Sequence, residues 1–151
     1  MKVSIKILLY KKCIDYADQR ISAIQKAIDE AIESGNDETK SSSGDKHETG
    51  RAMAQLEQEK GSKQLTEAIE FRGILKKINP EQKSEKIFLG SLVYTNRGCF
   101  YIAVAAGKIM IEDEVFFAIS QVSPIALKLI GLSKNDNLVF NGNNYKIKEI
   151  V

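Results

Sequence analysis

The chain has 151 residues, of which 43% are hydrophobic and 28% are charged, and its formal net charge is only +2. This length fits one ordinary domain or two small ones. The near-neutral charge excludes a protein with a uniformly basic nucleic-acid-binding surface, so any charged specialisation must be local. The first apolar run is too short and too interrupted for a signal peptide or a membrane span. We therefore expect a cytoplasmic protein with no membrane partner, in which Cys13 and Cys99 are free thiols.

From about Ile14 to Glu33, apolar residues recur at spacings of three and four and predict a helix. The apolar stripe is narrow, as in the seam of a coiled coil, and charged residues fill the other faces. We expect the helix to end between Gly35 and Thr39, where the stripe stops. The stripe consists of Ile14, Ala17, Ile21, Ile24, Ile28 and Ala31.

A second, less regular stripe follows Gly50 and predicts a helix that ends at Asn79-Pro80, because proline lacks an N–H and restricts the residue before it. Gly61 should weaken the middle of this helix by about 1 kcal/mol relative to alanine. Two such helices joined by a short reversal form an antiparallel hairpin with arms on the order of 45 Å long. The second stripe consists of Ala52, Met53, Leu56, Leu65, Ala68, Ile69, Leu75 and Ile78.

The reversal between the helices is a polar tip at residues 41–50, in which Asp45 and Glu48 lie three positions apart. An acidic pair at the end of a long stalk can carry a metal ion. The same spacing fits a capping box, in which the first side chain accepts from an early backbone N–H and the second reaches back. Both interpretations remain open, and they do not exclude each other. Asp37 and Glu38 could add to the acidic tip or lie in a solvated loop. His47 has no cysteine or histidine partner and is expected to be a solvated tip residue.

Residues 81–86 form a polar linker, and after it the period changes to that of strands. Ser123-Pro124 followed by Gly131 marks a short helix. The sequence thus predicts an α+β chain: an antiparallel coiled-coil hairpin over 1–80, then a small antiparallel sheet with one short helix over 87–151. The terminal hairpin turns at Asn141-Gly142, which supplies positive φ angles. Strands are expected at 87–89 with 91–94, 99–105, 115–119, 138–140 and 145–151.

Two segments of the chain together resemble the bacterial Gre transcript-cleavage factors. Gly44-Asp45-Lys46-His47-Glu48 is similar to the family's Gly-Asp-x-x-Glu tip. Residues 119–131, Ile-Ser-Gln-Val-Ser-Pro-Ile-Ala-Leu-Lys-Leu-Ile-Gly, are similar to its Ile-Ser-x-x-Ser-Pro-Ile-Ala-x-x-Leu-Ile-Gly run. The terminal strand pair, the order of the segments and the chain length also agree, so the resemblance covers nearly the whole chain.

The resemblance implies a coiled coil plus an FKBP-like domain, which docks on RNA polymerase and inserts the coiled coil into the secondary channel. Asp45 and Glu48 would then be the catalytic pair, holding a Mg²⁺ shared with the polymerase while backtracked RNA is cut at its 3′ end. Ser120 and Pro124 would contact the polymerase. The chain would be a monomeric accessory factor and not an enzyme, with no metal of its own in isolation and no sequence-specific DNA binding. Lys46 and Arg51 could offset RNA phosphate charge.

The chain also departs from the family pattern after Glu48. Thr49-Gly50-Arg51-Ala52 stands where the family has Asn-Ala-Glu-Tyr, and Val122 replaces a residue that is usually polar. Two alternatives stand beside cleavage, and the altered tip favours the first of them. One is a regulator of the same shape that enters the channel and blocks or remodels it without releasing RNA. The other is an FKBP-like prolyl isomerase or a helical-hairpin chaperone.

Overall fold

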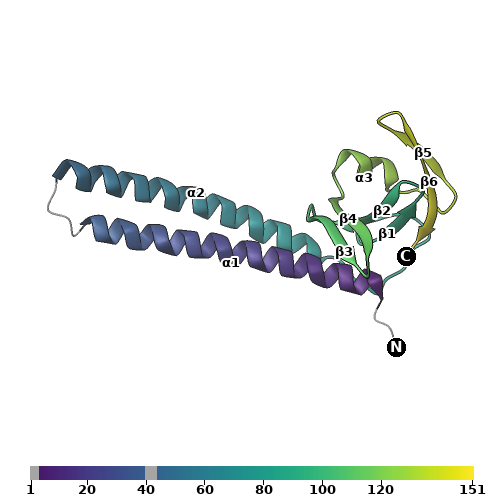
Figure 1. Cartoon of the computed structure of the whole chain (residues 1–151), viewed down its shortest axis with the longest axis horizontal. Coiled ribbons are helices and arrows are strands. Elements are labelled where there is room, and N and C mark those ends of the chain that lie inside the picture. The colour runs from purple at the N-terminus through teal and green to yellow at the C-terminus, as the bar shows by residue number, and fades with distance from the viewer. Residues whose placement is uncertain (1–3, 40–43) are drawn as a thin grey trace. The chain divides into compact units, whose positions relative to one another are not determined.

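The computed structural model describes residues 4–39 and 44–151, and the side chains of 4–36 and 49–151. A long helical hairpin precedes a six-stranded sheet that carries one short helix, which confirms the predicted α+β class (Figure 1). None of the described helices combines the length and the apolar character that a bilayer crossing requires. The elements are α1 (Ile5–Thr39), α2 (Gly44–Lys76), β1 (Leu92–Thr95), β2 (Gly98–Ala103), β3 (Gly107–Ile111), β4 (Glu114–Ser120), α3 (Pro124–Leu129), β5 (Asn137–Phe140) and β6 (Asn143–Ile150).

The chain divides into two compact units. The sheet unit comprises Met1–Tyr16 together with Gly73–Val151, and the arm comprises Ala17–Arg72. The first turns of α1 and the last turn of α2 therefore belong with the sheet. The sequence-based boundaries at residues 80 and 86 separate the helical part of the chain from the strands. The boundaries of the compact units instead separate groups of residues that pack together.

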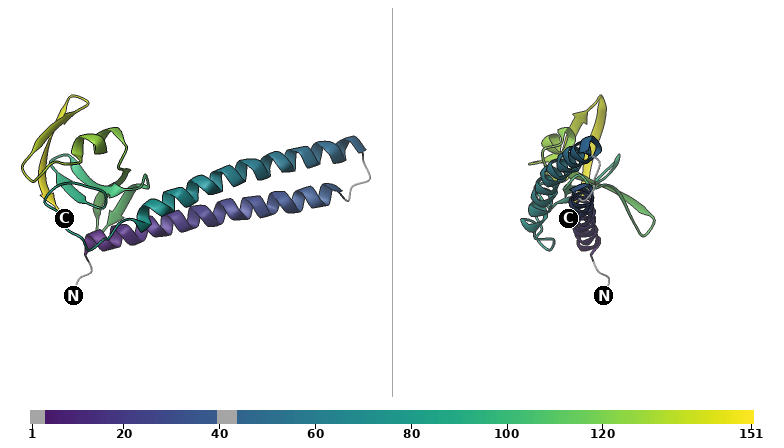
Figure 2. Two further views of the ribbon diagram at one scale, coloured as in Figure 1. Left: turned by 180° about the vertical axis from the view of Figure 1, so that it is seen from behind. Right: turned by 90° about the vertical axis from the view of Figure 1, so that its left-hand side faces the viewer.

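The two helices of the arm lie side by side in every view (Figure 2). In each helix the buried and half-buried positions recur alternately every three and four residues, which is the heptad seam of a coiled coil. The predicted stripe on α1 is thereby confirmed. The further half-buried residues described in the arm are Gly50, Arg20 and Phe71, and the guanidinium of Arg20 lies 5.2 Å from the ring centroid of Phe71. The seam positions are Ala17, Ile21, Ile24, Ile28, Ala31 and Gly35 on α1, and Ala54, Gln58, Gly61, Leu65, Ala68 and Arg72 on α2.

The seam of α2 differs from the stripe predicted for it. Met53 and Leu56 are more than half exposed, and small residues occupy every seventh position instead, at Ala54, Gly61 and Ala68. Small side chains let the backbones approach closely. A Cβ added at Gly61 would lie 2.5 Å from Cγ1 of Ile28. The expectation that Gly61 simply weakens the helix is therefore incomplete, because this position leaves room for the opposite helix.

The ends of α1 also differ from the prediction. The helix begins at Ile5 instead of near Ile14, and it continues through Gly35 to Thr39. Its first turns belong to the sheet unit, where Leu9 and Cys13 are fully buried. These two residues are therefore part of the core of the sheet unit and not of the coiled-coil seam. Gly35 does not end the helix because it is a seam residue, where an added Cβ would lie 3.3 Å from Cβ of Ala54.

The sheet has the strand order β3-β4-β2-β1-β6-β5. It is not purely antiparallel as predicted, because β2 pairs with β4 in parallel. The edge strand β3 was not predicted, and it joins β4 through a turn at Glu112 and Asp113, which both have positive φ. The predicted terminal hairpin is confirmed: Asn141 and Gly142 have φ of 50° and 76° and connect β5 to β6.

Both faces of the central strands are buried. On one face Phe100 and Ile102 of β2 pack with Ala126 and Leu129 of α3 in a single core cluster. Tyr101 between them points to the opposite face and is fully buried there. The pKa of Tyr101 is raised chiefly by its burial and also by the neighbouring Cys13 and Tyr10 of α1. The first turns of α1 therefore cover the second face of the sheet.

A buried lysine joins three segments of the sheet unit. Lys6 is only 2% exposed, and its ammonium donates to the carbonyl oxygens of Gln82, at 2.6 Å, and Val151, at 2.9 Å. Burial, with a smaller contribution from the charge of Lys83, lowers the pKa of Lys6. Lys6 thus ties the start of α1 to the segment after α2 and to the end of β6.

Candidate functional site

The tip residues that the sequence singles out lie at the start of α2. This helix begins at Gly44, so the backbone of Asp45, Lys46 and Glu48 belongs to its first turns. Their side chains, and those of Asp37, Glu38 and His47, lie outside the described residues. Within the described part of the chain, no three His, Cys, Asp or Glu side chains gather as metal ligands.

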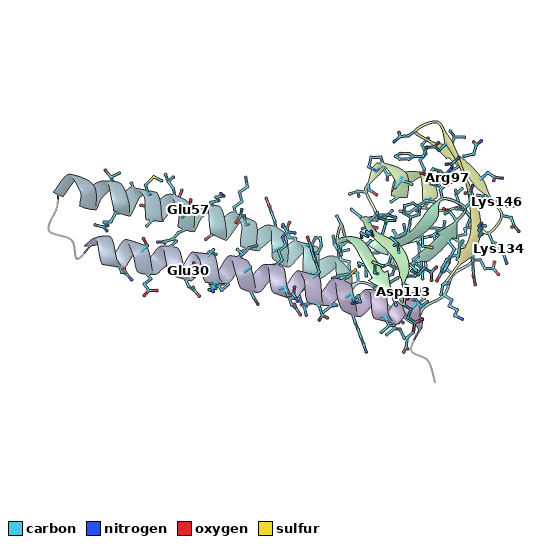
Figure 3. The ribbon with its side chains drawn as sticks, in the orientation of Figure 1. Glu30, Glu57, Arg97, Asp113, Lys134 and Lys146 are labelled. Atoms are coloured by element: carbon cyan, nitrogen blue, oxygen red, sulfur yellow. The ribbon has the colours of Figure 1, made fainter. Side chains whose placement is uncertain are left out.

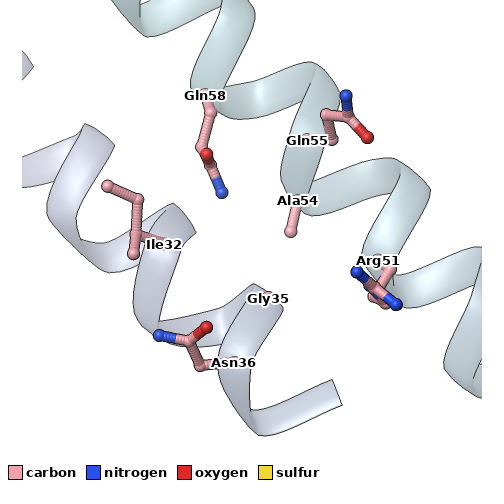
Figure 4. A pocket seen from close by; sticks show the side chains of 7 residues that line it. All are labelled: Ile32, Gly35, Asn36, Arg51, Ala54, Gln55 and Gln58. Atoms are coloured by element: carbon pink, nitrogen blue, oxygen red, sulfur yellow. The ribbon is translucent and has the colours of Figure 1, made fainter. Parts of the chain in front are cut away.

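Next to the tip, the two arm helices border a shallow groove of about 300 Å³ (Figure 4). Arg51, the candidate RNA contact whose side chain the structure describes, is exposed and lies at its rim. Two of its lining residues, Gly35 and Ala54, approach closely, because a Cβ added at Gly35 would lie 3.3 Å from Cβ of Ala54. Its lining offers amide and guanidinium groups together with two aliphatic side chains, Ile32 and Ala54. The lining residues are Ile32, Gly35, Asn36, Arg51, Ala54, Gln55 and Gln58.

The second candidate segment is a tight turn between β4 and α3. The Ser120 hydroxyl accepts from the Val122 N–H at 3.2 Å, and the Ser120 carbonyl accepts from the Ser123 N–H at 3.0 Å. Ser123 occupies the predicted N-cap position of α3. Its hydroxyl, however, donates to the Ser120 carbonyl at 2.7 Å and makes no cap hydrogen bond. Ser120 is thus half-buried and held within the turn.

This turn presents apolar side chains to solvent. Pro124 is exposed, as a contact residue must be, and Val122 and Leu127 beside it are 72% and 65% exposed. Ser120 and Pro124 could be singled out from the sequence, whereas Leu127 could not, because helical periodicity alone does not show which apolar face of a six-residue helix is buried. Ala126 and Leu129 are the residues of α3 that enter the core.

Among the described residues, the titratable groups with the largest pKa shifts lie in the sheet unit. Burial raises the pKa of the Cys13 thiol to about 12. Burial is also the main cause that raises the pKa of Tyr94 to about 12, and the charge of Glu114 adds to it. The Tyr101 hydroxyl is buried and has no hydrogen-bond partner among the described residues. Cys13 and Tyr101 are core groups, so their pKa shifts bear on stability and do not indicate a reaction centre.

Comparison with known proteins adds no identification. No protein-family model, no curated protein and no solved structure gives a significant match to this chain.

Proposed function

We propose that this chain is a Gre-like transcription factor, which binds bacterial RNA polymerase at its secondary channel and stimulates cleavage of backtracked RNA. The observation that carries the proposal is the order of elements around the two resembling segments. A long helical hairpin bears Asp45 and Glu48 at its far turn, and a six-stranded sheet with one short helix bears residues 119–131. The proposal implies a cytoplasmic protein, because bacterial RNA polymerase works there.

The length of the arm supports the proposal. From Ala17 to Thr39, α1 rises about 35 Å at ~1.5 Å per residue. The α2 seam of Ala54, Gly61 and Ala68 keeps the two backbones close, so the arm is narrow for its length. A long and narrow hairpin can carry side chains into a channel that a globular unit cannot enter.

The chemistry of the tip supports the proposal as well. Asp45 and Glu48 are the residues that would hold Mg²⁺ together with polymerase groups, because magnesium is commonly bound through one or two carboxylates plus phosphate. The ion would help to generate the attacking hydroxide or to stabilise the leaving oxygen of the RNA. Lys46 and Arg51 would offset phosphate charge nearby, and Ser120 and Pro124 would contact the polymerase through the turn before α3.

The test is a backtracked elongation complex with Mg²⁺, to which the full chain is added. The wild type should shorten the RNA from its 3′ end. The Asp45→Asn, Glu48→Gln double variant should still bind polymerase but should release no fragment.

The matched control is the Glu30→Gln, Glu33→Gln double variant. It removes the same two charges at the same spacing from exposed positions on the arm, and it should cleave like the wild type (Glu30 is labelled in Figure 3). If the wild type binds polymerase and releases no fragment, cleavage is refuted.

The departure at Thr49-Gly50-Arg51-Ala52 favours a second candidate within the same class, a secondary-channel regulator without cleavage. In the same assay this function predicts altered pausing or inhibition by the wild type, with no RNA fragment released. Glu48→Gln should then leave the inhibition unchanged, because the hairpin would inhibit by occupying the channel and not by binding a metal ion.

A further inference from the structure

An aromatic row crosses the face of the sheet that bears α3. We use this name for Phe117 of β4, Phe100 of β2 and Tyr145 of β6. The ring centroids of Phe117 and Phe100 are 6.1 Å apart, and those of Phe100 and Tyr145 are 6.3 Å apart. The guanidinium of Arg97 lies 5.8 Å from the centroid of Tyr145. Four planar groups from three separate segments of the sequence therefore form a continuous series.

The row leads from the core to the surface. Phe100 belongs to the core cluster under α3, whereas Phe117, its direct partner in the parallel β2–β4 pair, is 39% exposed. Gly98 lies beside both rings, and a Cβ added there would be 4.0 Å from each of them. The absence of a side chain at Gly98 leaves the edge of the exposed Phe117 ring uncovered, whereas Phe100 is only 9% exposed. The outer end of the row is therefore open to a ligand.

A cation lies at each end of the aromatic row. Lys108 of β3 is the register partner of Phe117, so it shares the same face and is exposed. Arg97, at the other end of the row, is fixed in place because its Nε donates to the carbonyl of Asn144 at 2.8 Å. The other residues that β3 and β4 place on this face are Met110, Val115 and Ile119, none of which is acidic. No described carboxylate forms an ion pair with Lys108 or Arg97.

We propose that the aromatic row binds single-stranded nucleic acid. An unpaired base would stack on Phe117 with a neighbouring phosphate on Lys108, and the strand would continue along the row so that a later phosphate contacts Arg97. Exposed aromatic rings on a sheet, flanked by cations, are the arrangement by which proteins bind single strands without reading their sequence. An apolar peptide would also use Phe117 and Met110, but it would have no use for the two cations. The charges therefore favour a polyanion with flat unpaired bases.

The inference goes beyond the proposed function, because it concerns the sheet unit and not the tip. It needs no polymerase and no metal. A failure of RNA cleavage would leave it standing, and its own failure would leave the proposed function standing.

The experiment measures fluorescence anisotropy of labelled ten-nucleotide oligouridine, as RNA and as the deoxy form, with the full chain at two salt concentrations. The wild type should bind, and binding of either oligonucleotide supports the proposal. Phe117→Leu keeps an apolar side chain but lacks the flat face, and it should weaken binding about tenfold. Arg97→Gln should reduce the slope of log affinity against log salt by about 0.7.

Val139→Ala is the matched control, because Val139 is 58% exposed on β5 and lies outside the row. This variant should bind like the wild type, and thermal unfolding confirms that each variant is folded. The proposal is overturned if the wild type binds neither oligonucleotide, if Phe117→Leu and Val139→Ala bind equally well, or if a blunt duplex binds as tightly as the single strand. Capture of an uncharged proline-rich peptide in place of the oligonucleotide would also overturn it.

Discussion

Replacing Gly61 by alanine should destabilise the arm, although alanine is the better helix former. Helix propensity alone predicts a gain of about 1 kcal/mol for this change in the interior of α2. The structure opposes this gain, because the new Cβ would lie 2.5 Å from Cγ1 of Ile28. Isoleucine in a helix has one strongly preferred χ1 rotamer, so it cannot swing aside cheaply. Overpacking of this kind costs about 1–3 kcal/mol, which leaves a net loss of about 1 kcal/mol.

The measurement is urea unfolding of the full chain followed by the helical circular-dichroism signal. Gly73→Ala is the control for propensity, because Gly73 is also helical and a Cβ there would meet nothing within 4 Å. This control should stabilise the chain by about 0.5–1 kcal/mol.

A second background isolates the contact. In Ile28→Ala, the carbon that blocks the new methyl group is gone, so adding Gly61→Ala should stabilise the chain by about 1 kcal/mol. The effect of Gly61→Ala on stability thus depends on residue 28: the substitution should destabilise the chain opposite isoleucine and stabilise it opposite alanine. If Gly61→Ala stabilises the chain in the wild-type background, the close approach of α1 and α2 at Ile28 and Gly61 is refuted.

Two further predictions concern the sheet unit. Tyr101→Phe should leave stability unchanged or raise it by up to about 1 kcal/mol, because it removes a buried hydroxyl without a described partner; a loss above about 1 kcal/mol in urea unfolding would show that the hydroxyl is bonded. Stability should fall as pH rises from 9 towards 12, because the unfolded chain ionises Cys13 near pH 9 while burial raises the pKa of the folded thiol to about 12. The contribution of this thiol is complete below pH 9, and Cys13→Ala should make the alkaline decline shallower; an unchanged slope would contradict the burial of the thiol.

The sequence predicted α1 better than α2, and the reason lies in side-chain size. Ile21, Ile24 and Ile28 mark the α1 seam with large apolar groups, which periodicity detects directly. On α2 the buried seam positions are Ala54, Gly61 and Ala68, while the larger Met53 and Leu56 are exposed. An apolar stripe is recognised by its large side chains. The prediction therefore placed Met53 and Leu56 on the buried face of the first half of α2, although both are exposed.

The sheet shows the same limit in another form. The Asn141-Gly142 turn was predicted because these residues adopt positive φ readily. Strand β3 was missed because it is a mostly exposed edge strand whose turn uses Glu112 and Asp113 at positive φ, where such side chains are uncommon.

The candidate sites divide along similar lines. Asp45 and Glu48 could be singled out because the motif that contains them is contiguous in sequence. The aromatic row could not be predicted, because Phe100 and Phe117 become neighbours only through the parallel pairing of β2 with β4. No pattern of alternation specifies which of two strands will pair in parallel.

The division of the chain into units makes the arm an insertion within another folded unit. Because Met1–Tyr16 and Gly73–Val151 form one unit, the sheet keeps both of its segments when the intervening hairpin is shortened. The heptad seam sets the step: removing seven residues from each helix at matching heights would shorten the arm by about 10 Å and keep the seam in register. The reach of the tip is therefore an adjustable length, which can change in discrete steps without any change to the sheet that anchors it.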